Sequence, residues 1–251
     1  MAKDRIGMAT KKNNILAIDV GGTNVKIRDQ NHTDPVKIPS GKLMTSAEMV
    51  KQVKGATTGW GFTHVSIGYP GPVVHNNPAQ EPHNIGGGWV GFDFEKAFGC
   101  PVRVVNDAAM QAIGSYEGGR MLFLGLGTGL GSALIVDGVV APLELAHLPY
   151  KNGMTYEEYV GVHGLERLGK TDWRKHVGKV ATLLKNAMVA DYVVLGGGNA
   201  RLIKELPPNM ELGDNSKAIL GAFRLWEGIP KTGSKTPSVK AVQSGDSGKW
   251  A

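Results

Sequence analysis

The hydrophobic residues of this chain gather in short continuous runs, and three of these runs lead into glycine-rich segments. The runs span residues 15–18, 122–124 and 192–195. Uninterrupted apolar runs of this length are typical of strands that are covered on both faces. The glycines that follow have no Cβ, so the backbone can turn sharply or approach another group closely there. The pattern therefore predicts buried strands that end in glycine turns.

Other segments have the hydrophobic spacing of a helix with one buried face. Thr45 and Glu48 form a capping-box pattern in front of one such segment. Its apolar residues Met49, Val50 and Val53 are expected to point inward. Further helices are predicted from 107 to about 117 and at 155–168, 171–188 and 215–227, with further strands at 64–68 and 102–105.

Strands and helices alternate along the chain, which indicates an α/β fold. The strand and glycine-turn pattern occurs in each half, so we expect two lobes, an N-terminal one at 14–118 and a C-terminal one at 119–227. The segment 228–251 is rich in Gly, Ser, Thr, Pro and Lys and lacks hydrophobic periodicity. Such a composition predicts a disordered tail.

The first glycine turn has the composition of a phosphate and metal site. Asp19 precedes Gly21 and Gly22, and Thr23 and Lys26 follow them. The glycines let backbone N–H groups approach a phosphate, to which Thr23 can donate its hydroxyl. Asp19 is the candidate ligand for the magnesium ion (Mg2+) that accompanies phosphates. Taken alone, the same residues fit equally well a β-hairpin in which the glycines are only the turn.

A second turn, formed by Gly127, Thr128 and Gly129, repeats this composition, and two such turns can hold one phosphate chain. Neither turn matches a dinucleotide-binding fingerprint, and the chain has no Walker A sequence. A Rossmann dehydrogenase or a P-loop enzyme is therefore not expected. A third cluster, which could hold a nucleoside, consists of Gly196, Gly197 and Gly198.

Asn106 and Asp107 stand where a predicted strand ends and a helix begins, which is where ligands bind in open α/β sheets. A carboxylate there can accept a proton from a substrate hydroxyl. Both residue types are also preferred helix caps, so the pair in isolation favours a capping role. Glu144 and His147 lie three residues apart and could share one ligand, but a zinc site at His147 would lack further ligands.

The bulk composition excludes several classes of protein. The chain has 251 residues with a single cysteine, so an intrachain disulfide is impossible and a reducing cytoplasm is the expected compartment. No apolar run approaches the roughly 20 residues of a membrane span, so no membrane partner is expected. The net charge of +6 favours acidic partners in general. A basic cluster, which is more often a solvated face than a site, consists of Arg167, Lys170, Arg174, Lys175 and Lys179.

Taken together, the motifs resemble the ROK family of sugar kinases, within the hexokinase, heat-shock protein 70 and actin superfamily. The resemblance covers roughly 14–226 and rests on the glycine turns and on segments 68–71, 104–109 and 144–147. It implies a two-lobed hexokinase/actin-like (ribonuclease H-like) fold with a phosphate loop in each lobe. The short length of the chain and the sequence of residues 124–148 look most like the polyphosphate glucokinase branch of that family.

The resemblance also implies roles for residues. Asp107 would be the general base, while Asn106, Glu144 and His147 would bind sugar hydroxyls. Two departures from the family stand out. Segment 149–158 replaces a cysteine-rich zinc motif, so the histidine has to be positioned without metal, and Ala146 stands where the family usually has glycine.

A further sugar-binding glutamate of the family corresponds to Glu157 or Glu158. Because Thr155 and Glu158 fit a capping box, Glu157 is the favoured sugar ligand. Asn84 and Trp89 resemble residues beside the sugar pocket of the family. Trp89 can equally belong to the core.

These implications describe a cytoplasmic glucokinase that transfers a phosphoryl group from polyphosphate and/or ATP to the 6-hydroxyl of glucose or a close hexose. Mg2+ would be the cofactor and a homodimer the assembly, and Arg174, Lys175 and Lys179 would form a track for polyphosphate. A degenerate sugar-binding or regulatory protein is the alternative. Only about fourteen residues precede the first strand, too few for a helix-turn-helix, so no nucleic-acid partner is expected.

Overall fold

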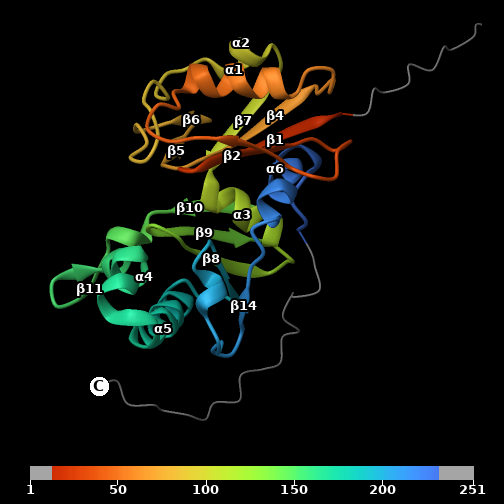
Figure 1. Cartoon of the computed structure of the whole chain (residues 1–251). Helices are drawn as coiled ribbons and strands as arrows, with labels where there is room; N and C mark the ends of the chain where they lie inside the picture. Colours follow the sequence, from red (N-terminus) through yellow and green to blue (C-terminus); the bar gives the residue numbers. More distant parts are fainter. Residues whose placement is uncertain (1–12, 232–251) are drawn as a thin grey trace, which may run out of the picture.

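The computed structural model of the protein describes residues 13–231. This part forms two five-stranded sheets, with helices on their faces and between them (Figure 1). The strand orders are β3-β2-β1-β4-β7 and β10-β9-β8-β13-β14. The predicted α/β class is therefore confirmed. The disordered tail predicted at 228–251 lies outside the described residues from 232 onward.

The first sheet is built from the N-terminal part of the chain. Its strands are β1 (Ile15–Val20), β2 (Asn24–Arg28), β3 (Val36–Pro39), β4 (His64–Tyr69) and β7 (Val102–Asn106). β1 pairs antiparallel with β2 and parallel with β4, and β4 pairs parallel with β7. The other elements here are α1 (Ser46–Ala56) and α2 (Phe94–Phe98), which lie on the outer face, and the ribbon of β5 (Val73–Val74) and β6 (Asn77–Pro78).

The second sheet repeats this topology. Its strands are β8 (Arg120–Leu126), β9 (Leu130–Val136), β10 (Val139–Leu143), β13 (Tyr192–Gly196) and β14 (Met210–Leu212). β8 pairs antiparallel with β9 and parallel with β13, as β1 does with β2 and β4. The other elements are η1 (Leu145–His147), β11 (Pro149–Lys151), β12 (Met154–Thr155), α4 (Tyr156–Val160), α5 (Val162–Ala187) and η2 (Ala200–Leu202).

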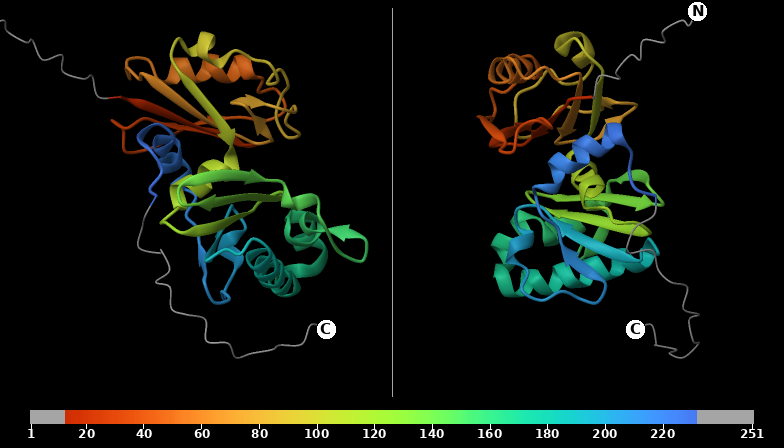
Figure 2. Two further views of the ribbon diagram at one scale, coloured as in Figure 1. Left: turned by 180° about the vertical axis from the view of Figure 1, so that it is seen from behind. Right: turned by 90° about the vertical axis from the view of Figure 1, so that its right-hand side faces the viewer.

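Two helices, α3 (Asp107–Ser115) and α6 (Lys217–Glu227), pack against each other between the sheets (Figure 2). Glycines allow their backbones to approach. A Cβ built on Gly114 would lie 1.8 Å from the carbonyl oxygen of Lys217, and one built on Gly221 would lie 1.8 Å from that of Met110. Any side chain at either glycine would push the helices apart.

Each of these two helices packs on one sheet, although the strand before it in the sequence belongs to the other sheet. α6 follows β14 of the second sheet but packs on β1 and β4, where Ser66 Oγ donates to the carbonyl oxygen of Ala222 at 2.7 Å. α3 follows β7 of the first sheet, and its residues Ala109 and Ile113 are buried in one cluster with Phe123 and Ile135 of the second. The exchange ties the two sheet units together.

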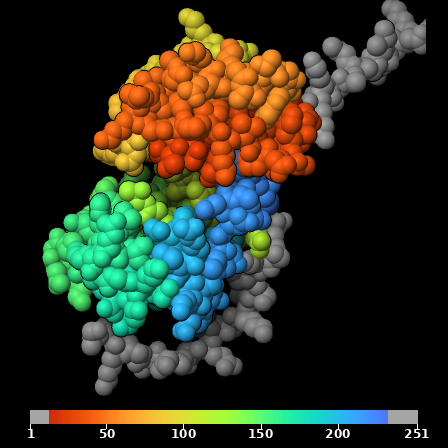
Figure 3. All heavy atoms as spheres, in the orientation of Figure 1, coloured from red at the N-terminus to blue at the C-terminus, as the bar shows by residue number. Residues whose placement is uncertain are grey.

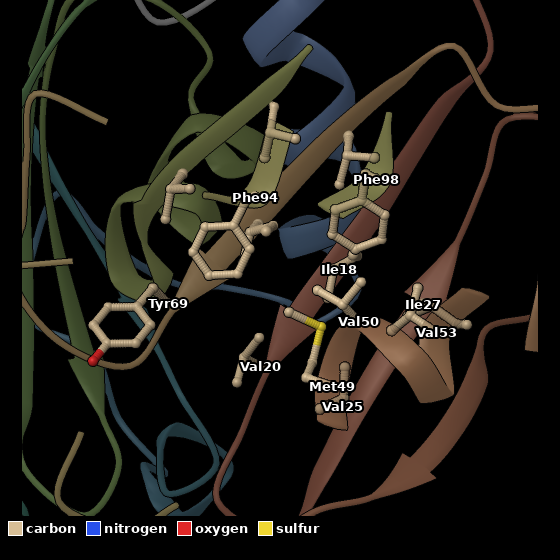
Figure 4. Close-up of a cluster of buried hydrophobic side chains, with 14 of the residues drawn as sticks. Ile18, Val20, Val25, Ile27, Met49, Val50, Val53, Tyr69, Phe94 and Phe98 are labelled. Carbon is tan, nitrogen blue, oxygen red and sulfur yellow. The ribbon is translucent and has the colours of Figure 1, made fainter. Parts of the chain in front are cut away.

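The core of the first sheet lies between its strands and α1 (Figure 4). Met49, Val50 and Val53 are buried there, as their spacing predicts. Burial of such apolar side chains stabilises the fold by about 1.5–3 kcal/mol each, before the entropy of ordering them is counted. α1 is therefore held mainly by its inward face.

Two helix predictions need correction. At α1, Thr45 caps the N–H of Glu48, but the Glu48 carboxylate accepts from Gln52 Nε2 at 2.8 Å, so the reciprocal half of the capping box is absent. The helices predicted at 155–168 and 171–188 are instead α4 and α5, which meet at Gly161. The expected interruption near residue 170 is a kink within α5 at Gly169, whose φ is 70°.

Candidate active site

The candidate active site lies at the carboxyl ends of the parallel strands of the first sheet, where they face the second sheet. Asp19 on β1 pairs with Gly68 on β4, and Gly68 pairs with Val105 on β7. Asp19 therefore lies in the same row as Val105, two residues before Asp107. The molecular surface is hollowed between the red-to-orange atoms of the first sheet unit and the green atoms of the second (Figure 3). We call this hollow the interlobe cleft.

The first glycine turn joins β1 to β2. The N–H of Gly21 donates to the carbonyl oxygen of Asn24 at 3.1 Å, and Ser40 Oγ donates to the carbonyl oxygen of Gly21 at 2.6 Å. The hairpin geometry considered from the sequence is thus present. It is compatible with a phosphate loop, because Gly22 and Thr23 at its tip are exposed. Ser40, which directly follows β3 and fixes this turn, carries no signal in the sequence.

Asp19 and Lys26 face each other at the base of this turn. Lys26 Nζ lies 3.4 Å from Asp19 Oδ2, and the Asp19 side chain is only 14% exposed. Burial raises the pKa of Asp19 above its usual value, although the charge of Lys26 acts in the opposite direction. The pair therefore places one acidic and one basic group directly beside an exposed, glycine-rich backbone.

Asp107 is the first residue of α3 and is partly buried. Its Oδ1 accepts from the N–H of Ala108 at 2.7 Å. Burial, followed by the negative charges of Asp19 and Glu144, raises the pKa of Asp107 to about 7. A carboxylate with a pKa near neutrality is suited to accept a proton from a hydroxyl group. The influence of Asp19 and Glu144 also shows that Asp107 lies where the two sheet units meet.

Asn106 takes the capping role that its residue type favours. Its Oδ1 accepts from the N–H groups of Ala108 and Ala109 at 3.0 and 3.2 Å, and its Nδ2 donates to the carbonyl oxygen of Gly71 at 3.0 Å. These bonds leave one Nδ2 hydrogen for a ligand. The sugar contact predicted for Asn106 therefore stays a prediction, limited to that hydrogen.

The second glycine turn joins β8 to β9 and is held by groups outside it. Asn199 Nδ2 donates to the carbonyl oxygen of Gly127 at 3.1 Å, and the N–H of Val162 donates to that of Thr128 at 3.0 Å. A Cβ built on Gly129 would lie 2.0 Å from Glu157 Oε2, so the turn also packs against this carboxylate. Asn199 was not identified from the sequence, although it directly follows the third glycine cluster.

That third cluster contacts the second turn rather than standing apart. The φ of Gly197 is 82°, and a Cβ there would lie 2.6 Å from the carbonyl oxygen of Leu126. A Cβ on Gly196 would collide with the ring of Phe123, whereas Gly198 is exposed with open space beside it. Close packing thus explains why glycine stands at two of these three positions, 196 and 197. The nucleoside role predicted for Gly196, Gly197 and Gly198 remains a prediction.

Glu144 directly precedes the short helix η1, His147 is its last residue, and both are exposed. Leu145 and Ala146 between them are buried, which anchors the segment to the second core. Ala146 fits into the helical turn, so the replacement of the family's glycine is accommodated.

The segment that follows η1 is a hairpin, β11–β12, packed by aromatic rings. The ring of Tyr150 packs against those of Tyr156 and Tyr159, and its hydroxyl lies 3.0 Å from His176 Nδ1 on α5. The N–H of Tyr156 donates to the carbonyl oxygen of Leu148 at 3.1 Å, which links η1 to α4. Within residues 13–231 no group of three or more His, Cys, Asp and Glu side chains is arranged to hold a metal ion by itself. Aromatic contacts therefore hold this hairpin in place, directly after the predicted sugar ligands Glu144 and His147.

The capping box predicted at α4 is present, with Thr155 and Glu158 bonded in both directions. Glu158 is thereby occupied, while Glu157 Oε2 accepts from the N–H of Leu130 at 3.3 Å beside the second turn. Asn84 is exposed, and its Cβ lies 3.4 Å from a Cβ built on Gly22, which puts it against the first turn.

Trp89 is a core residue. Its side chain is fully buried between Tyr69 and Phe94, and its Nε1 donates to the carbonyl oxygen of Gly86 at 2.7 Å. Of the two alternatives left open by the sequence, packing is therefore the correct one. Glu81, which the sequence did not single out, accepts from the N–H of Trp89 at 3.1 Å and fixes the same loop.

The residues at the first turn fit a magnesium ion. Mg2+ is usually held by one or two carboxylates together with substrate phosphates and water. Asp19 and Asp107 raise the local negative charge, and Asp19 stands beside the exposed turn that would receive the phosphates. This donor set is suited to Mg2+ rather than to zinc, which prefers nitrogen and sulfur ligands.

Fold and site together define a two-lobed α/β protein with paired glycine loops around a buried carboxylate. The family model of the ROK family matches residues 11–141, and the chain belongs to this family. Among curated proteins, polyphosphate glucokinase of Mycobacterium tuberculosis is 28% identical over 225 residues, covering 81% of this chain and 84% of that protein. Polyphosphate glucokinase of Mycobacterium leprae is also 28% identical, covering 80% of this chain and 68% of that protein.

Solved structures show the same fold. The inorganic polyphosphate/ATP-glucomannokinase of Arthrobacter sp. strain KM has a TM-score of 0.71 at 24% identity, covering 84% of this chain and 96% of that one. A ROK family glucokinase of Streptomyces griseus, solved with glucose and AMPPNP, has a TM-score of 0.63 at 18% identity, with coverages of 85% and 99%. The two-lobed fold and the family predicted from the sequence are therefore confirmed. None of the helices within the described residues is long and apolar enough to cross a membrane.

Proposed function

We propose that this protein is a glucokinase that transfers a phosphoryl group from polyphosphate and/or ATP to the 6-hydroxyl of glucose or a close hexose. The family membership and the polyphosphate glucokinases among its relatives support this activity. The observation that carries it is the placement of Asp107, a partly buried carboxylate with a pKa of about 7, at the start of α3 between the two sheet units.

Asp107 is the general base in this proposal. It accepts the proton of the 6-hydroxyl as the oxygen attacks the terminal phosphorus of the donor, and the bond from that phosphorus to the leaving phosphate oxygen breaks. A positioned base of this kind contributes about 10²–10⁴-fold to a rate. Closure of the two lobes would exclude water, which competes with the sugar hydroxyl as acceptor.

The remaining site residues divide into acceptor and donor groups. Glucose is held by side chains that pair with its hydroxyls, namely Asn84, Asn106, Glu144, His147 and Glu157. The donor phosphates lie against the backbone N–H groups of the two glycine turns, with the Thr23 and Thr128 hydroxyls and the Lys26 ammonium beside them. Asp19 would hold Mg2+, which neutralises charge on the transferring group when it is bound.

We also infer a cytoplasmic location and a homodimer, both from family resemblance and, for the location, from the single cysteine. Size-exclusion chromatography with light scattering tests the dimer, and a single monomer peak at micromolar concentration contradicts it. For ATP, Gly196, Gly197 and Gly198 would contact the nucleoside.

A turnover assay tests the proposal. The purified chain is incubated with glucose, Mg2+ and either long-chain polyphosphate or ATP, and glucose 6-phosphate is measured. We expect product with at least one donor and none without Mg2+. Binding of glucose without any turnover, with either donor, would instead establish the degenerate sugar-binding alternative.

A further inference from the structure

A groove runs along the second sheet unit on the side of α5. It lies between this helix and residues 204–207 of the connection between β13 and β14, and its volume is about 740 Å³. Residues of both segments line it, among them Thr171, Arg174, Lys175, Lys179, Lys204 and Pro207. None of the residues assigned above to the interlobe cleft lines this groove, but the predicted track residues Arg174, Lys175 and Lys179 do.

Four of the lining side chains are cationic and one, Glu205, is anionic. Lys175, Lys179 and Lys204 are exposed. Lys175 Nζ pairs with Asp172 Oδ1 at 2.8 Å, whereas within residues 13–231 neither Lys179 nor Lys204 forms an ion pair. Burial lowers the pKa of the neighbouring His176, and the charges of Lys151 and Lys179 act in the same direction, whereas Asp172 opposes them. The groove is therefore an electropositive channel.

Lys204 joins this channel from a segment remote in sequence from α5, so the sequence alone did not reveal it. Conversely, Arg167 of the basic cluster turns elsewhere, because its guanidinium donates to the carbonyl oxygen of Glu158 at 2.8 Å and lies over the ring of Tyr159. Folding thus selects which basic residues share one surface.

Hydrogen bonds connect the groove to the second glycine turn. Asn199 Nδ2 donates to the carbonyl oxygen of Gly127, the N–H of Leu202 donates to that of Asn199 at 2.9 Å, and Arg174 Nε donates to that of Leu202 at 2.5 Å. The end of the groove at Arg174 is therefore coupled through three bonds to the turn that faces the donor phosphates.

Helix α5 contacts both the second glycine turn and the groove. α5 begins at Val162, whose N–H donates to Thr128 of the second turn, and the groove occupies the face from Thr171 to Leu183. The kink at Gly169 interrupts the helix before the groove begins, and beyond it the groove extends about 18 Å along the helix at 1.5 Å per residue. Because no residue of the second turn lines the groove, we expect a donor of two or three phosphates held at the turn to leave it empty, whereas a long chain can extend into it.

We propose that this groove binds the distal part of a polyphosphate donor whose terminal phosphate is transferred in the interlobe cleft. The inference rests on the proposed function and adds a second contact region for the donor. An inorganic phosphate chain offers no base or ribose, so a row of ammonium groups is the chemistry that recognises it. Binding of this kind weakens as ionic strength rises.

The test uses the variant Lys175→Ala/Lys179→Ala/Lys204→Ala, which leaves Arg174 and its bond to Leu202 intact. The matched control, Lys51→Ala/Lys96→Ala/Lys185→Ala, removes three charges outside the groove. Equilibrium binding of labelled long-chain polyphosphate is measured for both, together with KM for long-chain polyphosphate, inorganic triphosphate and ATP. Thermal melting shows whether each variant is folded.

We expect the groove variant to bind long-chain polyphosphate about tenfold more weakly, with a similar rise in its KM, because three exposed ion pairs are lost. Triphosphate and ATP should keep their KM values, and the control should match the parent. An equal rise of the ATP KM would overturn the inference by making the groove a nucleotide site. Unchanged polyphosphate binding by the groove variant would also overturn the inference. A parent protein that binds polyphosphate but does not phosphorylate glucose would contradict only the proposed function.

Discussion

The two glycine turns occupy equivalent positions in sheets of the same topology, yet different residues surround and hold them. The first turn is closed by its own hairpin and by Ser40, and it stands beside Asp19 and Lys26. The second turn lies beside a carboxylate, that of Glu157, and is held from outside by Asn199 and by the junction of α4 and α5. Duplication of a topology has therefore not duplicated the chemistry.

The difference extends from the turns to the two sheet units. The first unit contributes Asp19, Lys26 and Asp107, which are groups that change or balance charge during phosphoryl transfer. The second contributes backbone N–H groups and the segment carrying Glu144, His147 and Glu157. Substitutions of these three charged residues should therefore act on kcat, and those of Glu144, His147 and Glu157 mainly on KM.

The largest effect is expected at Asp107. Asp107→Asn keeps the shape of the side chain but removes its capacity to accept a proton, so kcat should fall by about 10²–10⁴-fold with little change in the affinity for glucose. Steady-state kinetics and a direct glucose-binding titration measure the two quantities. Turnover within about threefold of the parent is incompatible with a general base at this position.

Glu144→Gln and His147→Ala address the second unit. Each should raise the KM for glucose about tenfold or more, because a hydrogen bond to a sugar hydroxyl is lost, while the KM for the phosphoryl donor stays nearly constant. Initial rates with each substrate varied in turn separate the two constants. If the donor KM moves instead, the division of labour between the sheet units is wrong.

Two glycines of the second turn form a matched pair. A Cβ on Gly129 would lie 2.0 Å from Glu157 Oε2, whereas one on Gly127 meets nothing within 4 Å. Gly129→Ala should displace the Glu157 carboxylate and raise the KM for glucose about fivefold, the cost of roughly one hydrogen bond. Gly127→Ala should leave the glucose KM unchanged, and equal effects of the two variants would show that Glu157 does not contact the sugar.

The sequence was sufficient for the elements whose cause is local. The buried strands, the cap at Asn106 and the capping box at Thr155 each follow from a few consecutive residues. What it could not supply depends on segments remote in sequence. The exchange of α3 and α6 between sheets needs Gly114 and Gly221 to meet, and nothing in either helix alone predicts that contact.

The candidate site shows the same limit. The residues implied by family resemblance were identified by motif, but the electrostatic influence of Asp19 and Glu144 on Asp107 arises only when both sheet units are folded. Trp89 illustrates the opposite case, because its residue type suits a sugar pocket as well as a core, and only its burial decides between them.

The last prediction concerns stability, and it separates the charge of Asp107 from its catalytic role. The folded-state pKa of about 7 lies above the ordinary value of 3.8, so the folded protein retains a proton that the unfolded chain releases. The stability that this proton contributes is complete below pH 3.8 and declines until the pH has passed about 7. Asp107→Asn is neutral throughout and escapes this decline.

The variant should therefore melt at a higher temperature than the parent near pH 8, and the difference should shrink steadily between pH 7 and pH 5. The rise of the pKa from 3.8 to about 7 sets an upper limit of about 4 kcal/mol for the gain. Thermal melting without substrate or metal measures it, and Asp107→Ala should show the same trend with pH. A melting-temperature difference that is constant from pH 5 to pH 8 would mean that the carboxylate titrates alike in both states, and the first sheet unit would then hold no base poised near neutrality.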